Sequence, residues 1–376
     1  MRIAHVNSNY GPNVFYRQLY DIQCRSHDLS VFVPSRVPGA VSRASHGEYA
    51  HEVHIAGTRN PLRFVSTYAD VYERLTGDLA EFGPDLVHAH TLFSNGVLAY
   101  WAWKQFGVPY VVAVRSTDIW HFLHLAPHLI PLGVRILRHA HRVVFLSAAS
   151  RSVALKRLVP PGERVSFEKR SVIIPNGLDS FWHDNLGDRK TGPGSRVVFC
   201  VVGGIMPRKN QVETALRVER EMRGIGLEWS LSVMGMVQDT GGPFGRGAGE
   251  RMARRLAEMD HVSMRGFGGP DAVRAVMDES HVFILLSRRE TFGRVYIEAM
   301  SRGLPVIYSR GEGFDQLFPE GEVGFSVDPR RGRCLGGVVA RILRDYANMS
   351  ERCLSRAEEC GWEGIARSYE SLYASL

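Results

Sequence analysis

Residues 282–308, VFILLSRRETFGRVYIEAMSRGLPVIY, carry the pattern that decides the fold. Residues 282–286 form a continuous apolar run, which is typical of a parallel strand buried on both faces. A polar loop at 287–293 follows, then helix-forming residues at 295–301, then a second apolar run at 306–308. This order of strand, loop, helix and strand predicts an α/β fold. Open parallel sheets bind ligands at the carboxyl ends of their strands, where this loop would lie.

Two carboxylates, Glu290 and Glu298, lie eight residues apart in this stretch. On one helix this spacing would leave them roughly 80° out of register, so we expect Glu290 on the loop and Glu298 in the helix. The N–H groups of Phe292, Gly293 and Arg294 would then face an anion, while the carboxylates would suit sugar hydroxyls. Alone, such a pair is more often a solvated loop charge and an ordinary helix residue. With its surroundings it suits a nucleotide-sugar.

The segment ETFGRVYIEAMSRGLPV at 290–306 closely resembles the signature E-(S/T)-F-G-x4-E-A-M-A-x-G-x-P-V of retaining glycosyltransferases, in particular glycosyltransferase family 4. Ser301 stands where the family usually has alanine. The resemblance implies the GT-B fold, in which two Rossmann-like domains face each other across a cleft. It also implies that the following residues bind the donor: Glu290, Thr291, Phe292, Gly293 and Glu298.

The length of 376 residues predicts two domains of roughly 180 residues each. The apolar content of 44% is enough for two hydrophobic cores. We predict an acceptor domain at 1–180 and a nucleotide-sugar donor domain at 195–361, joined by a linker at 181–195 that is rich in Gly, Asp and Pro. The resemblance implies that a last helix, at about 362–376, packs back on the first domain.

Charge and hydropathy restrict the location and the partners of the chain. The net charge of +7 is compatible with nucleic acid, an anionic membrane surface or a phosphorylated substrate, but no nucleic-acid-binding motif accompanies it. The amino terminus lacks a signal-peptide pattern, and the five cysteines are widely spaced. We therefore expect a cytoplasmic protein with reduced thiols. The basic and apolar stretch 129–143 is either a helix packed on its sheet or a peripheral contact with the inner face of a membrane.

Three segments of the first half match acceptor-side positions of the family. Gly11 lies in the loop after the strand at 2–6, where the family often has two glycines, so no role is assigned to Pro12 or Asn13. His90 ends the segment DLVHAH, and the resemblance places such a histidine near the cleft. A structural histidine is an equally good interpretation. Asp118 matches the aspartate of the family pattern His-Gly-x-Asp.

Arg115 takes the place of the histidine in that pattern. As a permanent cation with five donors, it could hold a donor phosphate or an anionic acceptor, or it could be a surface arginine at the end of a strand. Nearby, His121, His124 and His128 have near-helical spacing, but Pro127 interrupts them and no carboxylate or cysteine is close. We therefore predict no metal site.

The second half supplies the phosphate-binding candidates. The strand at 196–202 leads into Gly203-Gly204, and Lys209 stands at the entrance of the next helix. This resembles the family segment V-G-R-(L/I)-x-x-x-K, whose arginine and lysine hold the diphosphate. Lys209 matches, but Gly204 takes the arginine position, so Arg208 or Arg115 would replace that charge.

Two further segments complete the prediction for the second half. The strand and turn at 262–267 resemble the part of the family that packs against the base, with Phe267 as a candidate contact. The glycine-rich stretch 241–249 lacks the ending of a P-loop and is expected to be a flexible surface connection.

The resemblance implies a retaining, metal-independent glycosyltransferase of the hexosyl or N-acetylhexosaminyl type, with a role in polysaccharide biosynthesis. A UDP- or GDP-sugar would donate to a hydroxyl of a glycan, a lipid-linked acceptor or a small molecule. Lys209, Arg115 and Glu290 would act at the reaction centre. Two alternatives remain open: a non-catalytic nucleotide-sugar-binding protein, and a GT-B sugar-nucleotide 2-epimerase.

Overall fold

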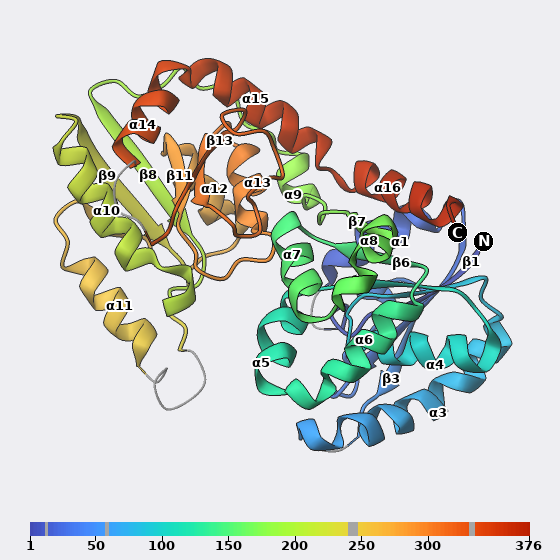
Figure 1. Cartoon of the computed structure of the whole chain (residues 1–376). Coiled ribbons are helices and arrows are strands. Elements are labelled where there is room, and N and C mark those ends of the chain that lie inside the picture. Colours follow the sequence, from blue (N-terminus) through green and yellow to red (C-terminus); the bar gives the residue numbers. More distant parts are fainter. Residues whose placement is uncertain (12–13, 57–59, 240–246, 331–334) are drawn as a thin grey trace. The chain divides into compact units, whose positions relative to one another are not determined.

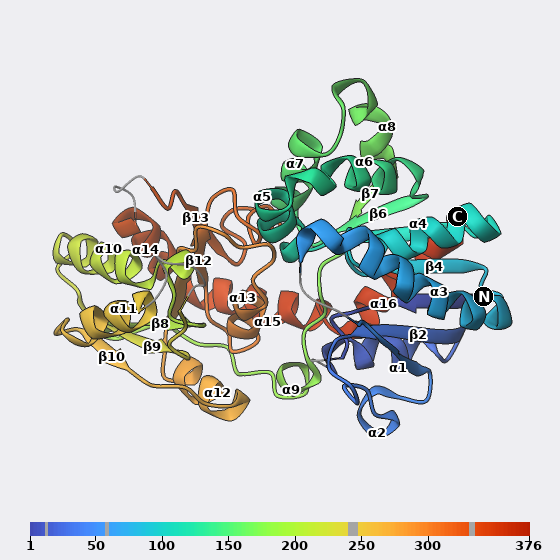
Figure 2. The same ribbon diagram turned by 90° about the horizontal axis from the view of Figure 1, so that it is seen from below.

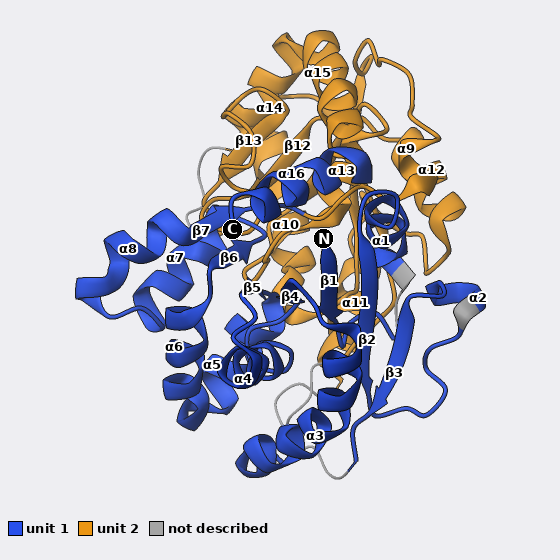
Figure 3. Ribbon diagram, turned by 90° about the vertical axis from the view of Figure 1, so that its right-hand side faces the viewer, with its two compact units in different colours: residues 1–175, 362–376 blue, residues 176–361 orange. Residues whose placement is uncertain are grey.

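The computed structural model describes residues 1–11, 14–56, 60–239, 247–330 and 335–376 (Figure 1). It divides into two compact units, shown in separate colours in Figure 3. Unit 1 comprises Met1–Pro175 and Trp362–Leu376, and unit 2 comprises Asn176–Gly361. Pro12, Asn13 and most of the predicted glycine-rich connection, residues 241–246, lie outside the described residues.

Unit 1 contains a seven-stranded parallel sheet in the order β3-β2-β1-β4-β5-β6-β7. Its strands are β1 (Arg2–Val6), β2 (Asp28–Ser35), β3 (Ala50–His54), β4 (Leu86–Ala89), β5 (Tyr110–Val114), β6 (Arg142–Phe145) and β7 (Ser171–Ile173). The strand order reverses between β1 and β4. The loops that leave these two strands therefore flank the position where doubly wound sheets bind ligands.

Helices cover both faces of this sheet (Figure 2). The helices of unit 1 are α1 (Arg17–Gln23), α2 (Arg43–His46), α3 (Phe64–Phe82), α4 (Gly96–Phe106), α5 (Leu123–Leu125), α6 (Ile130–His139), α7 (Ala148–Arg157), α8 (Arg164–Arg170) and α16 (Trp362–Ala374). Two hydrophobic cores result: α3, α4 and α6 pack on one face, and α1 and α16 pack on the other. The carboxyl-terminal helix thus completes the core of unit 1.

Unit 2 contains a six-stranded parallel sheet in the order β10-β9-β8-β11-β12-β13. Its strands are β8 (Arg196–Val202), β9 (Glu228–Met234), β10 (Val262–Met264), β11 (Val282–Leu285), β12 (Val306–Ser309) and β13 (Gly324–Val327). Its helices are α9 (Ser180–His183), α10 (Gln211–Arg223), α11 (Ala248–Ala257), α12 (Pro270–Asp278), α13 (Arg294–Met300), α14 (Leu335–Arg344) and α15 (Tyr346–Glu359). The order reverses between β8 and β11.

Short turns of other helical types complete the chain. They are the 3-10 turns Val14–Tyr16, Pro61–Arg63, Pro127–Leu129, Pro161–Glu163 and Pro207–Lys209, and a π-helical turn at Asp118–Phe122. The predicted α/β class is confirmed by the two parallel sheets. The predicted linker 181–195 is not wholly irregular, because it contains most of α9.

Candidate functional site

The loops after β8 and β11 are joined at the point where the strand order of unit 2 reverses. The Arg288 N–H donates to the Arg208 carbonyl (2.9 Å), and Asn210 Nδ2 donates to the Leu286 carbonyl (3.1 Å). Asn210 has a positive φ of 59°, which ends the turn Pro207–Lys209 and lets α10 begin. Two loops far apart in the sequence thus form one surface at the carboxyl edge of the sheet.

An ion pair lies across this surface. Lys209 Nζ is 2.5 Å from Glu290 Oε2, and the two side chains are 14% and 12% exposed. Both groups therefore remain open to a ligand, yet are shielded enough for their charges to act strongly on it. The two residues were predicted as separate site residues, and the structure places them in contact.

Glu312, in the loop after β12, fixes the backbone of Glu290. Glu312 Oε2 accepts a hydrogen bond from the Glu290 N–H (2.7 Å), and the Gly313 N–H donates to the Glu290 carbonyl (2.9 Å). Gly313 admits no side chain, because a Cβ there would lie 2.2 Å from the Thr291 carbonyl carbon. Burial raises the pKa of Glu312 to about 6. The hydrogen bond from the Glu290 N–H lowers this pKa, and the negative charge of the Glu290 side chain raises it.

The start of α13 places the remaining motif residues. Gly293 has a φ of 84°, and a Cβ there would lie 2.5 Å from the Tyr296 ring, so glycine is required. Thr291 and Phe292 are buried against the body of unit 2. As predicted, Glu290 lies on the loop and Glu298 in the helix. The Glu290 carboxylate is held by its neighbours, since its Oε1 accepts a hydrogen bond from the Thr291 N–H (3.2 Å) and its Oε2 contacts Lys209.

The Glu298 carboxylate is partly exposed, and no donor from the described residues reaches it. Burial raises the pKa of the Glu298 carboxylate. The positive charges of Arg294 and Lys209 lower this pKa, and the negative charge of Asp179 raises it. A carboxylate that lacks protein donors can accept hydrogen bonds from the hydroxyls of a bound ligand.

Gly204 lies at the exit of β8, beside Gln211 and Gln238. Gln211 Nε2 donates to the Gly204 carbonyl (2.7 Å), and a Cβ on Gly204 would lie 2.8 Å from Gln238 Oε1. The space near the missing arginine side chain is thus partly taken by Gln238. Arg208 is exposed beside Lys209, and Phe267 is 70% exposed at the carboxyl end of β10.

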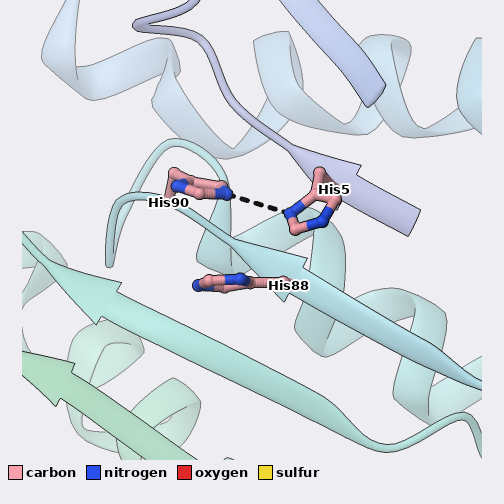
Figure 4. A group of neighbouring side chains, drawn as sticks. All are labelled: His5, His88 and His90. Atoms are coloured by element: carbon pink, nitrogen blue, oxygen red, sulfur yellow. Dashed lines mark hydrogen bonds between the residues drawn. The ribbon is translucent and has the colours of Figure 1, made fainter. Parts of the chain in front are cut away.

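The corresponding reversal point of unit 1 holds a closed cluster of three histidines (Figure 4). His5 on β1 pairs in register with His88 on β4, and His90 follows two residues later, so all three point to one face of the sheet. All three are fully buried. His5 Nδ1 lies 3.1 Å from His90 Nε2, and the His88 and His90 rings stack at 4.2 Å.

Tyrosine hydroxyls complete this network. Tyr20 Oη lies 3.2 Å from His90 Nε2, and Tyr373 Oη lies 2.7 Å from His88 Nδ1. Burial lowers the pKa of His5 to about 3, and the charge of His27 lowers it further. Burial also lowers the pKa values of His88 and His90 well below the usual range. The cluster is therefore neutral at physiological pH.

Among the described residues, these three histidines form a group of side chains that could hold a metal ion, because their ligand atoms lie within 4.8 Å of one another. The group has no carboxylate or thiolate, and the nearby Arg115 charge lowers the pKa values of His88 and His90. A divalent ion would add positive charge to a buried site that already holds a guanidinium. We therefore interpret the cluster as a hydrogen-bond network. His124 and His128 instead contact the backbone carbonyls of Ile119 and Pro61.

Arg115 and Asp118 are buried in unit 1 and bound to its backbone. Arg115 Nε donates to the His90 carbonyl (3.3 Å), and its guanidinium lies 6.0 Å from the Tyr16 ring centre. The Asp118 carboxylate accepts from the N–H groups of Leu92, Phe93 and Arg115, at 3.0, 3.2 and 2.8 Å. Burial nevertheless raises its pKa to about 6. In this arrangement Asp118 joins the loops after β4 and β5.

Gly11 follows β1 on the same side of the sheet. A Cβ there would lie 3.3 Å from Val33 Cγ1, so the loop packs closely on β2. The predicted acceptor-side residues Gly11, His90 and Asp118 thus all follow strands at or beside the reversal point of unit 1, whereas the predicted donor-binding residues lie in unit 2.

Comparisons with known proteins account for most of the chain. The family "Glycosyl transferase 4-like domain" matches residues 11–168, and the family "Glycosyl transferases group 1" matches residues 188–359. The chain belongs to the GT4-like glycosyltransferases. Similar solved structures include sucrose-phosphate synthase from Thermosynechococcus elongatus (TM-score 0.73, 20% identity, covering 100% of this chain and 98% of that one). Another is Anabaena HepE in complex with UDP (TM-score 0.73, 18% identity, 100% of both chains). The predicted GT-B fold is confirmed.

Curated relatives of this GT4-like glycosyltransferase differ in their named activities. A GDP-mannose-dependent alpha-mannosyltransferase of Corynebacterium glutamicum is 24% identical over 405 residues, covering 100% of this chain and 87% of the relative. The sulfoquinovosyl transferase SQD2 of Arabidopsis thaliana is 25% identical over 273 residues, covering 68% of this chain and 49% of the relative. The match thus spans about half the length of SQD2. The comparisons support glycosyl transfer and leave the donor and the acceptor open.

Proposed function

We propose that this GT4-like glycosyltransferase transfers a sugar from a nucleoside diphosphate sugar to an acceptor hydroxyl with retention of anomeric configuration. The observation that carries the proposal is the Lys209–Glu290 pair at the reversal point of unit 2, with the Glu298 carboxylate on the adjoining helix. The cation suits a phosphate and the carboxylates suit hydroxyls. One site therefore meets the three chemical parts of a nucleotide-sugar: diphosphate, ribose and sugar ring.

Each group has a distinct role in this proposal. Lys209 holds the diphosphate, Glu290 binds hydroxyls of the transferred sugar, and Glu298 binds the ribose. Exposed Phe267 stacks on the base. A UDP- or GDP-sugar is the donor; among the proteins compared, a relative is named for GDP-mannose and HepE was solved with UDP.

In the reaction, the bond between the anomeric carbon and the β-phosphate oxygen breaks, and a bond to the acceptor oxygen forms on the same face of the sugar. The acceptor proton passes to the departing phosphate. Lys209 stabilises the negative charge that develops on the leaving diphosphate, which is electrostatic catalysis at the developing charge.

Arg208 supplies the second positive charge in place of an arginine at position 204. It is exposed and adjoins Lys209 in unit 2, whereas the Arg115 side chain is buried among groups of unit 1. We also propose that these side chains make a metal ion unnecessary. The acceptor is a glycan, a lipid-linked sugar or a small molecule with a free hydroxyl.

The test is a thermal-shift panel with UDP, GDP, ADP, dTDP and CMP in the presence of EDTA. A ligand at 100 times its Kd adds about 2.7 kcal/mol to the stability of the folded state, which raises the melting temperature by a few degrees. We expect one diphosphate to stand out, and its sugar conjugates would then be assayed, with the product anomer determined by NMR. Absence of any shift, with or without magnesium, contradicts the proposed donor site, and an inverted product contradicts retention.

A further inference from the structure

A groove lies on the outer surface of unit 1, where the helices α3 and α4 pack side by side (Figure 1). Its volume is about 380 Å³, which is within the range of roughly 300–1,000 Å³ that is usual for small-molecule sites. The groove is lined by Ala69, Tyr72, Glu73, Thr76, Trp101 and Gln105. None of these residues belongs to the predicted acceptor-side or donor-binding residues, so the groove is a separate feature of unit 1.

The lining residues form one strip on each helix. The four on α3 are spaced i, i+3, i+4 and i+7, and the two on α4 are four residues apart, so each set shares one helix face. The strip of α3 that enters the hydrophobic core is made of other residues: Phe64, Tyr68, Val71, Leu75 and Leu79. The groove therefore lies beside the core strip and faces outward.

Two aromatic rings form a corner of the groove. Tyr72 and Trp101 are half-buried, and their ring centres are 5.6 Å apart with an angle of 67° between the planes. Both rings pack on the core of unit 1 and also line the groove. Aromatic faces carry partial negative charge, so they attract the weakly positive C–H groups on the flat face of a sugar ring, and they also attract cations.

Hydrogen-bonding groups surround this corner. The Tyr72 hydroxyl donates to Gln105 Oε1 (2.9 Å), which orients the amide and leaves its NH₂ group as a donor for a ligand. Thr76 Oγ1 donates to the Tyr72 carbonyl (2.7 Å) and can still accept a hydrogen bond. Glu73 is exposed and forms no ion pair with the described residues. The groove thus combines donors and acceptors for hydroxyl groups with an aromatic corner.

The charge of the lining restricts the class of ligand. Glu73 carries a negative charge, and no Lys or Arg is among the described residues that line the groove. A nucleotide, a nucleic acid or an anionic lipid finds no opposite charge there and would be repelled by the carboxylate. A neutral glycan has both flat C–H faces for the rings and hydroxyls for the polar groups.

We propose that the groove between α3 and α4 binds a sugar ring of a neutral glycan chain, as a carbohydrate site additional to the reaction centre. The ring packs on Trp101 and Tyr72, and its hydroxyls bind Gln105 and Glu73. Such a site would keep a glycan attached to unit 1 between transfers. The inference concerns unit 1 alone and is measured without nucleotide, so its failure and the failure of the proposed donor site are distinguishable.

The test is saturation-transfer NMR of the full chain with three neutral hexasaccharides: maltohexaose, cellohexaose and α-1,6-mannohexaose. Tetramethylammonium serves as the cationic probe. The main variant is Trp101→Ala, and Trp101→Phe keeps an aromatic face. The matched control is Trp103→Ala, which removes the other half-buried tryptophan of α4, one that stacks on His139 and does not line the groove. Gln105→Ala removes an exposed amide and tests the groove without a change in the core.

We expect saturable binding of at least one hexasaccharide. Trp101→Ala should raise its Kd at least about fivefold and Trp101→Phe much less, because an aromatic face remains. Gln105→Ala should raise the Kd about threefold, as the loss of a neutral hydrogen bond does, and Trp103→Ala should stay within about twofold of wild type. Melting temperatures show which variants are folded, and Gln105→Ala decides the outcome if Trp101→Ala is not.

Three results would overturn the proposal. The first is the absence of binding by all three hexasaccharides. The second is an equal rise of the Kd in Trp103→Ala and in Trp101→Ala, or an unchanged Kd in Gln105→Ala if Trp101→Ala is unfolded. The third is binding of tetramethylammonium in place of the glycans, which would assign the aromatic corner to a cationic ligand.

Discussion

The two sheets of this glycosyltransferase reverse their strand order in the same way but place opposite chemistry at the reversal. In unit 2 the position holds a charged pair, Lys209 and Glu290, at 14% and 12% exposure. In unit 1 it holds His5, His88 and His90, all fully buried and neutral. The difference shows that topology only provides a place for a ligand; the residues at the ends of the strands and after them decide whether that place is an open electrostatic site or a closed polar core.

The largest effect is expected when the negative charge of the unit 2 site is removed. Glu290→Gln keeps the size of the side chain, but it loses the ion pair with Lys209 and the stronger acceptor for sugar hydroxyls. We expect kcat/KM for the donor to fall about 10²- to 10³-fold. The control is Glu358→Gln, which removes an exposed carboxylate of α15. Activity within about twofold of wild type would remove Glu290 from the reaction centre.

The neutral cluster of unit 1 gives the next largest effect, which depends on pH. His5 has a folded-state pKa of about 3, so between pH 6.5 and 3 it takes up a proton on unfolding, and its contribution to stability falls as the pH falls. The stability advantage of wild type over His5→Gln should therefore shrink by about 2 kcal/mol between pH 7.5 and pH 5. Denaturant unfolding of both proteins at the two pH values measures this. A constant or growing difference would mean that His5 is protonated in the folded protein.

A substitution at Glu298 tests whether the unit 2 site recognises ribose. Glu298→Ala should raise the donor Kd about tenfold, since a hydrogen bond to a charged group contributes about 1.5 kcal/mol or more, and should change kcat less. Burial raises the pKa of this carboxylate, so donor affinity should also fall as the solution is acidified. Calorimetry with the ribonucleotide and its 2′-deoxy form distinguishes the role: wild type should prefer the ribonucleotide, and the variant should not. Equal donor affinity in both proteins would exclude the ribose contact.

The smallest effect is expected at Glu312, which holds the backbone of Glu290. Glu312→Ala removes the acceptor of the Glu290 N–H and should raise the donor KM about fivefold, at a stability cost of about 1 kcal/mol. Glu312→Gln keeps an acceptor and should recover most of the loss. Because the Glu312 pKa is about 6, wild-type KM should depend on pH near that value, and the KM of Glu312→Gln should not. If the Gln variant is as impaired as the Ala variant, the hydrogen bond does not position the loop.

The sequence predicts the strands and the ligand-facing loops well, because each depends on neighbouring residues. The apolar runs at 196–202 and 282–286 correspond to β8 and β11, and the predicted helix after Gly293 corresponds to α13. The strand β3, AHEVH, escaped prediction because its polar composition gives no apolar run. The last helix predicted at about 362–376 corresponds to α16, which begins directly after Gly361.

The features that were missed depend on contacts between distant residues. The Lys209–Glu290 contact joins positions 81 residues apart, and the His5–His90 contact joins positions 85 apart. Glu312 meets the Glu290 N–H only because β11 and β12 are neighbours in the sheet. Local patterns identify a residue type at a strand end, whereas the identity of its partner follows from strand order. The proposed roles of Arg115, His90 and Asp118 towards an acceptor stay predictions.

Whether the loop after β8 binds phosphate is tested by the affinity of Lys209→Ala for a nucleoside diphosphate and for the matching monophosphate, measured by calorimetry in EDTA. If Lys209 holds the diphosphate, the variant should lose at least about tenfold in affinity for the diphosphate and less than about threefold for the monophosphate. The preference of wild type for the diphosphate would then largely disappear. Equal losses for both nucleotides, or none for either, would contradict the assignment of this loop as the phosphate site.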